Sequence, residues 1–194
     1  YKDGLAVSGK GRTCRKLPLI CGIDLAGTVV ESSNDNFKTG DKVLVNGFGL
    51  SETSNGAYSQ FQRLKADCRV KVPSAFSLEQ SMAIGTAGYT SMLGVQAIQD
   101  HGIKPEDGPI LVTGAAGGVG SVAISLLAGL GYNVTLPTGL DEETEEILTT
   151  LGTESVIAPD NQAPDRKPRE TANWQADIEL SSINSRHPRP NGRQ

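Results

Sequence analysis

The sequence has few of the residues that build disulfide frameworks or zinc sites. Its 194 residues include three cysteines, Cys14, Cys21 and Cys68, and two histidines. Three scattered cysteines are too few for a disulfide framework, and a reducing, cytoplasmic setting is therefore expected. A catalytic zinc site needs about three converging Cys, His or acidic ligands, and a structural site about four. With no C-x-x-C motif and two distant histidines, the sequence predicts that no metal is bound.

Long apolar runs are also missing, and so are basic residues over part of the chain. No apolar run approaches membrane-spanning length, and the opening residues lack the apolar segment of a signal peptide. No membrane association is therefore expected. The net charge is −4, and residues 105–165 contain no Lys or Arg. Their acidic character argues against nucleic acid as a partner. The chain does not begin with Met, and we expect it to start inside a longer protein.

The pattern of apolar residues changes along the chain and predicts two domains. Residues 1–75 have β-branched runs bounded by Gly, Asn and Asp, which favours a small β-barrel. Ser77 with Gln80 fits a capping box that opens a helix, and Gly102 fits its end. Strand and helix patterns then alternate, which predicts a parallel sheet of about three strands. The expected domains are 1–80 and 81–174, followed by a polar tail at 175–194 that we expect to be disordered.

The stretch "VTGAAGGVGS" carries most of the functional information. Gly114, Gly117 and Gly120 are spaced three apart, with Gly118 in addition. A strand pattern precedes them and an amphipathic helix pattern follows. Glycines in such a turn allow a tight bend, close approach of a pyrophosphate and close packing of the helix. The N–H groups of the first helical turn then face the phosphates. The spacing differs from G-x-G-x-x-G, but its context predicts dinucleotide binding.

Several motifs occur in an order that resembles a known family. "YKDGLAVSGKG", "GIDLAGTV", "GTAGYTSM" and "VTGAAGGVGS" are similar to motifs of the medium-chain dehydrogenase/reductase superfamily. Within it, the chain most resembles the zinc-free acryloyl-CoA reductase and quinone oxidoreductase-like group. The resemblance implies an α/β fold in which a GroES-like β-barrel precedes a Rossmann domain. It also implies an NADPH-dependent oxidoreductase that delivers hydride to the C=C bond of acryloyl-CoA or a similar enoyl-CoA.

The same resemblance implies a set of cofactor-binding residues and leaves the catalytic residues unknown. One residue is expected beside the nicotinamide, four along the pyrophosphate and three at the adenine ribose. In that order they are Tyr1; Ala116, Gly117, Gly118 and Val119; Thr138, Gly139 and Leu140. A homodimer of the full-length protein is expected from relatives. The proton donor is not identified.

The chain departs from the family at the adenine-ribose loop and after Trp174. The group places a cation where this chain has Leu140, and a second one near Pro159, so the partners of a 2′-phosphate are missing. Asp141 and the two glutamates after it are interpreted as a helix cap and first turn. NADP is still the expected cofactor, on the resemblance. Beyond Trp174 the family pattern stops, and we expect the Rossmann domain to be incomplete.

Three functions remain open. The first is an NADPH-dependent enoyl-CoA reductase, and the second is a quinone oxidoreductase of the same group. The third is a non-catalytic fragment that binds a nucleotide or a partner chain. A basic cluster near the N-terminus is interpreted as part of a solvated loop. The functional alternative is a surface that docks the phosphates of CoA. Its members are Lys2, Lys10, Arg12, Arg15 and Lys16.

Overall fold

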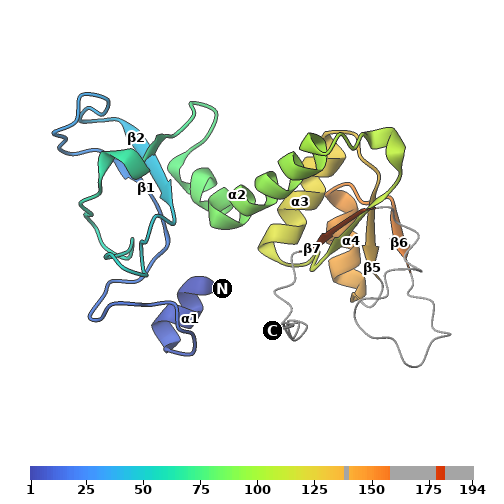
Figure 1. The fold of residues 1–194 in the computed structure, drawn as a ribbon, viewed down its shortest axis with the longest axis horizontal. Coiled ribbons are helices and arrows are strands. Elements are labelled where there is room, and N and C mark those ends of the chain that lie inside the picture. The colour runs from blue at the N-terminus through green and yellow to red at the C-terminus, as the bar shows by residue number, and fades with distance from the viewer. Residues whose placement is uncertain (138–139, 158–177, 182–194) are drawn as a thin grey trace, which may run out of the picture. The chain divides into compact units, whose positions relative to one another are not determined.

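The computed structural model describes residues 1–137, 140–157 and 178–181 of the chain. The chain divides into two compact units, Tyr1–Tyr89 and Thr90–Gln194, and each is described by itself (Figure 1). The division lies within a long helix, and the expected domain boundary after residue 80 stays a prediction. No helix among the described residues is long and apolar enough to cross a membrane.

Unit 1 contains a three-stranded antiparallel sheet in the order β1-β2-β3. The strands are β1 (Asp24–Thr28), β2 (Lys42–Asn46) and β3 (Val70–Lys71), and the register pairs Asp24 with Asn46 and Thr28 with Lys42. On β2 the side chains alternate between buried and less buried, since successive residues of a strand face opposite sides. Val43 and Val45 are buried and pack in the core of this unit.

Two segments of unit 1 differ from the strand-like pattern expected of residues 1–75. Lys2–Ser8 form a helix, α1, which ends at Gly9 in the left-handed conformation. The stretch 58–73 contains only the short helix η1 (Ala66–Cys68) and the two-residue strand β3. The Arg69 side chain donates hydrogen bonds to the carbonyl oxygens of Leu64 and Lys65. These acceptors are therefore satisfied without a neighbouring strand.

Helix α2 (Leu78–Asp100) has the predicted capping box and the predicted end. The Gln80 N–H donates to Ser77 Oγ at 3.1 Å, and the Ser77 N–H donates to Gln80 Oε1 at 2.8 Å. These two bonds satisfy N–H groups that a helix start would otherwise leave unpaired. Gly102 has a φ of 78° just beyond the helix, and its N–H donates to the Gln99 carbonyl at 2.8 Å. Both predictions are confirmed.

Helix α2 is broken at Gly85, and a side chain of β1 holds the break. Gly85 has φ 50° and ψ −158°, and a Cβ there would lie 3.1 Å from Asp24 Oδ2. The backbone N–H of Thr86 donates to Asp24 Oδ2 at 3.0 Å, and its hydroxyl donates to Oδ1 at 2.5 Å. The amide of Asn46 donates to Oδ1 at 2.8 Å. The carboxylate of Asp24 thus caps the second part of the helix from a neighbouring strand.

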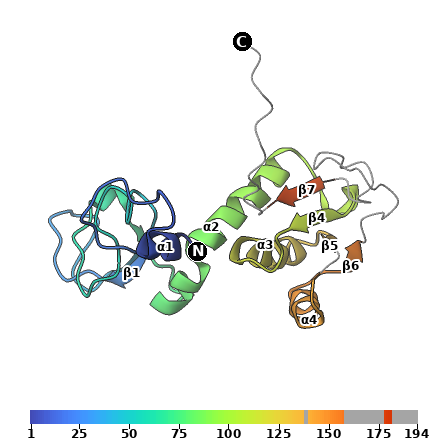
Figure 2. The ribbon, with the colours of Figure 1, turned by 90° about the horizontal axis from the view of Figure 1, so that it is seen from below.

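Unit 2 is a parallel α/β layer in which β4 lies in the interior of the sheet. In chain order its elements after α2 are η2 (Pro105–Asp107), β4 (Ile110–Thr113), α3 (Gly118–Gly129), β5 (Val134–Pro137), α4 (Glu142–Thr150), β6 (Ser155–Ile157) and β7 (Ile178–Ser181). The strand order is β6-β5-β4-β7, and all pairs are parallel. Figure 2 shows α3 and α4 on one side of the strands and the C-terminal part of α2 on the other.

The core of unit 2 combines both faces of the sheet. Tyr132 belongs to this core, and its hydroxyl donates to the Ile103 carbonyl at 2.7 Å, so its polar end is satisfied within an apolar surrounding. The residues of the core that are fully or almost fully buried are Val95, Ile110, Val112, Ala115, Ala123, Ile124, Leu127, Val134, Leu136 and Leu148. Burial on both faces explains why β4 is an apolar run of Ile110, Leu111 and Val112.

Strand β7 was not predicted from the sequence. Residues 178–181 pair with β4 from Ile110↔Ile178 to Thr113↔Ser181, whereas the sequence favoured a disordered tail from 175 and a sheet of about three strands. The difference has a physical reason, because a buried strand with an unpaired edge leaves its N–H and C=O groups unsatisfied. Four residues that can extend suffice to pair with that edge. Residues 158–177 and 182–194 lie outside the described part of the chain.

The Asp24 contacts predict a large effect of one substitution. Asp24→Ala removes the acceptor of three hydrogen bonds, which come from the Thr86 N–H, the Thr86 hydroxyl and the Asn46 amide, in a half-buried site. We expect it to lower the free energy of unfolding by about 2–4 kcal/mol, measured by urea denaturation. Asp35→Ala is the matched control, since Asp35 is exposed, and should change stability by less than about 0.5 kcal/mol. Equal effects of the two substitutions would contradict this role of Asp24.

Candidate functional site

The glycine turn joins β4 to α3 at the carboxyl end of the sheet. Gly114 follows the last residue of β4 and has a φ of 63°, which glycine adopts readily. The N–H of Gly117 donates to the Gly114 carbonyl at 2.9 Å, which closes the turn. Ala116, Gly117 and Gly118 are exposed, and Val119 is partly buried. The turn therefore presents three of its four predicted pyrophosphate residues to solvent.

Gly120 is the residue that lets α3 approach this turn. A Cβ at Gly120 would overlap the Gly114 carbonyl oxygen and would lie 2.7 Å from the Ala115 Cα. Both contacts are with backbone, which cannot move aside as a flexible side chain can. A Cβ at Gly117 would lie 3.2 Å from the Gly114 oxygen, which is also tight. Packing therefore requires glycine at position 120, the last of the three glycines spaced three apart.

The N-terminus of α3 is open for an anion. Its N-cap residue is Gly117, no side chain of the described residues caps it, and its first turn contains no acid. The Ser121 N–H donates to the Gly117 carbonyl at 2.9 Å. The N–H groups at the start of the helix, before position 121, have no carbonyl acceptor within the helix. These groups and the helix dipole favour a negative charge at this end. The arrangement can hold a phosphate or pyrophosphate without a cationic side chain.

Ser91 fixes the first turn of α3 against α2 and was missed in the sequence. Its side chain is 1% exposed, and its Oγ donates to the Val119 carbonyl at 2.6 Å. A buried hydrogen bond of this kind sets the position of the helix end that carries the open N–H groups. Ser91 belongs to the motif "GTAGYTSM", but that motif indicates a helix, and nothing in it indicates a contact with residue 119.

Strand β5, which precedes the predicted adenine-ribose residues, ends at the same edge of the sheet as β4. Because β4 and β5 are parallel neighbours, the segments after them leave the same edge. Leu140 is partly buried and packs against the core of unit 2, so its side chain is used by the fold. Thr138 and Gly139 lie outside the described residues, as does Pro159, and their roles stay predictions.

The acids after Leu140 cap a helix, as the sequence predicted. Asp141 is the N-cap of α4, and its Oδ1 accepts the Thr144 N–H at 2.9 Å. Its Oδ2 accepts the Thr144 hydroxyl at 2.8 Å. These hydrogen bonds, the backbone one first, lower the pKa of Asp141 below its usual value. Glu142 and Glu143 stand in the first turn, where negative charge is favourable.

Tyr1 belongs to unit 1, whereas the glycine turn belongs to unit 2. It is the N-cap residue of α1, and its carbonyl accepts the Leu5 N–H at 3.0 Å. Its side chain is 95% exposed. Nearby in the sequence, Asp3 accepts hydrogen bonds from the Ile23 N–H at 3.1 Å and from the Tyr58 hydroxyl at 3.3 Å. The placement of Tyr1 beside a nicotinamide stays a prediction.

No metal cluster occurs among the residues that the structure describes, since no three His, Cys, Asp or Glu side chains come together there. Asp24, the acid of the "GID" motif, has both carboxylate oxygens engaged by Asn46 and Thr86. Its three hydrogen bonds give this acid a structural role. The predicted absence of zinc stays a prediction.

Comparison with known proteins connects these features. Residues 1–94 match the alcohol dehydrogenase GroES-like domain. The acrylyl-CoA reductase AcuI of Ruegeria pomeroyi is 47% identical over 90% of this chain and 53% of its own length. The crystal structure of yhdH from Salmonella enterica in complex with NADP is 45% identical, with a TM-score of 0.78 over 86% of this chain and 51% of that one. This chain is a homologue of the medium-chain dehydrogenases/reductases.

A third relative of this chain has a different cofactor in its crystal structure. YhfP of Bacillus subtilis, whose name assigns it provisionally to the quinone oxidoreductases, is 42% identical over 81% of this chain and 48% of its own. Its crystal structure has NAD bound and gives a TM-score of 0.75, covering 81% and 48% of the two chains. The chain spans about half the length of the curated relatives it matches. The predicted fold class, a GroES-like domain with a Rossmann-type parallel sheet, is confirmed.

Two glycines of the same helix allow a matched test of the turn in this homologue. Gly120→Ala forces backbone apart and should lower the free energy of unfolding by about 2–4 kcal/mol, and it should weaken NADPH binding. Gly129→Ala meets nothing within 4 Å and should stabilise the chain by up to about 1 kcal/mol, because alanine is the better helix former. Urea denaturation and NADPH fluorescence measure the two effects. Similar behaviour of the two variants would contradict the packing role of Gly120.

Proposed function

We propose that this protein is an oxidoreductase that transfers hydride from NADPH to the C=C bond of acryloyl-CoA or a similar enoyl-CoA. The observation that carries the proposal is an exposed glycine turn with an open helix N-terminus, in a chain 47% identical to a protein named acrylyl-CoA reductase. Bound NADPH supplies the hydride, and the protein binds and orients it. Residues 116–119 would hold its pyrophosphate through backbone N–H groups.

The choice of NADP rests on relatives rather than on local charge. Structures at 45% and 46% identity contain NADP or NADPH, and one at 42% contains NAD. In this chain Leu140 stands where a cation is expected for the 2′-phosphate, and it packs against the core. The acids from Asp141 onward belong to the cap of α4 and do not mark NAD. The Thr138 hydroxyl remains the proposed ribose contact.

A quinone oxidoreductase is the second candidate. The relative YhfP supports it at 42% identity, and the glycine turn serves either substrate equally well. The third candidate is a chain that binds a nucleotide or a partner without catalysis, since the chain spans about half the length of its relatives. A homodimer and a cytoplasmic setting are parts of the proposal for the full-length protein.

An assay with three ligands separates these candidates. We expect the 194-residue chain to oxidise NADPH with acryloyl-CoA and to release propionyl-CoA, followed by NADPH absorbance and mass spectrometry. Oxidation with a benzoquinone but not with acryloyl-CoA would support the second candidate instead. A change of NADPH fluorescence without any oxidation would support the third. Absence of both turnover and fluorescence change would contradict all dinucleotide functions.

The substitution Leu140→Arg tests what this position contributes to cofactor choice. A guanidinium near the 2′-phosphate should raise the ratio of NADPH to NADH affinity roughly tenfold. Loss of the partly buried leucine should at the same time lower the free energy of unfolding by about 1–2 kcal/mol. Ile147→Arg, on the exposed side of α4, adds the same charge as a control. An unchanged ratio in Leu140→Arg would show that the loop does not set the choice.

A further inference from the structure

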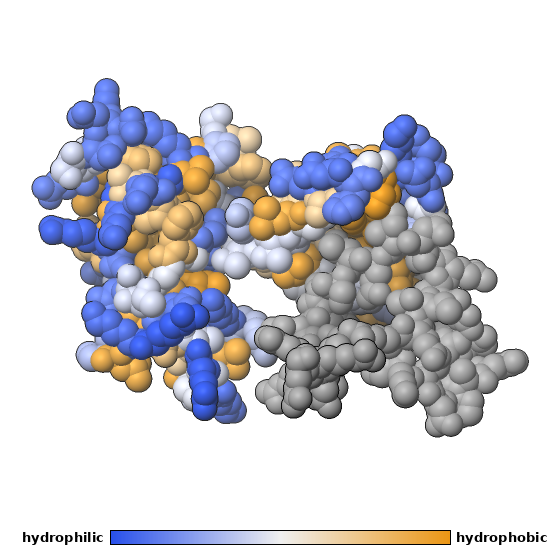
Figure 3. All heavy atoms as spheres, in the orientation of Figure 1, coloured by the Kyte–Doolittle hydropathy of each residue, from blue (hydrophilic) through white to orange (hydrophobic). Residues whose placement is uncertain are grey.

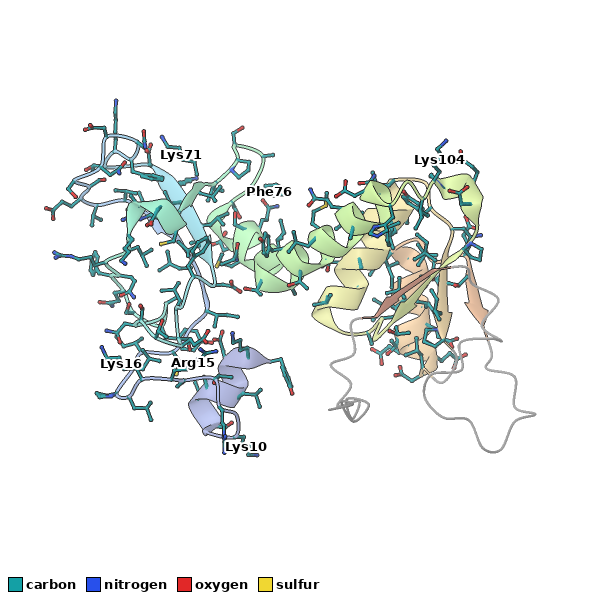
Figure 4. All side chains as sticks on the ribbon, in the orientation of Figure 1. Lys10, Arg15, Lys16, Lys71, Phe76 and Lys104 are labelled. Atoms are coloured by element: carbon teal, nitrogen blue, oxygen red, sulfur yellow. The ribbon has the colours of Figure 1, made fainter. Side chains whose placement is uncertain are left out.

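We propose that a cationic loop of unit 1, residues 9–17, binds the phosphate groups of coenzyme A through Lys10, Arg12 and Lys16. The proposal rests on the proposed function, since it assigns a second part of the same substrate. Figure 4 labels Lys10, Arg15 and Lys16, and all three side chains come from this loop. Figure 3 shows hydrophilic side chains gathered over that part of the unit.

Three of the four positive charges of the loop are uncompensated within the described residues. From Gly4 to Ile23 the sequence contains four cations and no acid. Lys10, Arg12 and Lys16 are exposed. Among the described residues the ion pairs are Arg15–Glu52 and Lys71–Asp41, so no described carboxylate neutralises the three exposed cations. Such a group of like charges attracts a ligand with several negative charges and loses that attraction in salt.

Arg15 has a different role from the other three cations. Its Nε lies 2.7 Å from Glu52 Oε1, and its backbone N–H donates to the Glu52 carbonyl at 2.8 Å. Arg15 is therefore bound twice to one residue from a distant part of the chain. We assign Arg15 and Glu52 as positioning residues that fix the loop.

The turn that carries Glu52 is a rigid support. Gly47, Phe48, Gly49 and Ser51 all have positive φ values between 49° and 82°. The Ser54 N–H donates to the Gly49 carbonyl at 2.9 Å, and the Ser51 N–H donates to the Ser54 carbonyl at 3.0 Å. Non-glycine residues keep such a backbone only where the surroundings determine it. A loop attached to this turn loses less entropy when it binds a ligand.

The near end of the loop is fixed as well. A Cβ at Gly11 would lie 3.0 Å from the Leu5 Cβ, so the loop packs directly on α1. After the loop, the Ile20 N–H donates to Asn55 Oδ1 at 3.1 Å, and the Ile20 carbonyl accepts the Gly56 N–H at 2.7 Å. The backbone is thus held on both sides of Lys10, Arg12 and Lys16, and their side chains remain free to reach a ligand.

The chemistry of coenzyme A matches this surface better than it matches the described part of unit 2. Coenzyme A carries a 3′-phosphate and a diphosphate, whereas its acyl end is uncharged. Lys104 is the one cation of unit 2 within its described residues. The open helix end of α3 accommodates one pyrophosphate, and the proposed function assigns it to NADPH. The phosphates of a second ligand need another site, and the cationic loop offers them opposite charge.

Direct binding without turnover tests the inference separately from the proposed function. Isothermal titration of the 194-residue chain with coenzyme A and with pantetheine, which lacks all three phosphates, should show tighter binding of coenzyme A. The variant Lys10→Gln/Arg12→Gln/Lys16→Gln should weaken coenzyme A about tenfold and leave pantetheine unchanged. Raising the salt concentration should reduce the difference between chain and variant. Equal affinity for coenzyme A and pantetheine would overturn the inference.

A control variant separates the loop from overall charge. Lys42→Gln/Arg63→Gln/Lys65→Gln removes three exposed cations from elsewhere in unit 1, and it should bind coenzyme A nearly as well as the unchanged chain. An equal loss in both triple variants would overturn the assignment to this loop. If the chain reduces acryloyl-pantetheine as well as acryloyl-CoA, the inference fails while the proposed function stands.

Glu52→Gln tests the positioning residues by the sign of its effect. If the loop acts only as a collection of charges, removing an acid should tighten the binding of an anion. If Glu52 fixes Arg15 and the loop, the same change should weaken coenzyme A, about threefold, and should not change pantetheine binding. Tighter binding of coenzyme A by Glu52→Gln would overturn the positioning role.

Discussion

The close approach of Gly120 to the backbone of Gly114 is the contact on which the glycine turn, the proposed nucleotide site, depends. A side chain at position 120 would overlap backbone atoms of residues 114 and 115. Without that approach, α3 could not begin directly above the end of β4, and its first N–H groups would not gather beside the turn. The hydrogen bond from Ser91 to the Val119 carbonyl then fixes the helix end from a second direction. A backbone site of this kind recognises phosphate by geometry and needs no cation.

Unit 1 relies on charged side chains where unit 2 relies on backbone. The Asp24 carboxylate holds the break of α2 through Thr86 and supports β2 through Asn46. Asp3 joins the N-terminal helix to the Ile23 backbone, and Glu52 joins the cationic loop to a strained turn. Each of these acids lies far in sequence from its partners. They replace part of the apolar packing that a three-stranded sheet is too small to supply.

The local features could be predicted because their partners are close in sequence. Ser77 and Gln80 are three residues apart, as are Asp141 and Thr144, and both caps form as expected. The glycine spacing from 114 to 120 encodes a turn of fixed shape. Helix α1 and strand β7 were not predicted from the sequence. Their short sequences have weak patterns, and β7 forms because the edge of β4 offers it hydrogen bonds.

The sequence by itself determined the order of domains, the parallel sheet, the glycine turn and the helix caps, because each depends on residues within one turn or one periodic segment. The tertiary structure alone decided that Asp24 meets Thr86, 62 residues away, that Ser91 meets Val119, and that Leu140 packs in the core. It also decided that Arg15 forms an ion pair with Glu52, while its three basic neighbours have no ion-pair partner within the described chain. Such pairings follow from how distant segments pack, and a sequence pattern records only what neighbouring residues do.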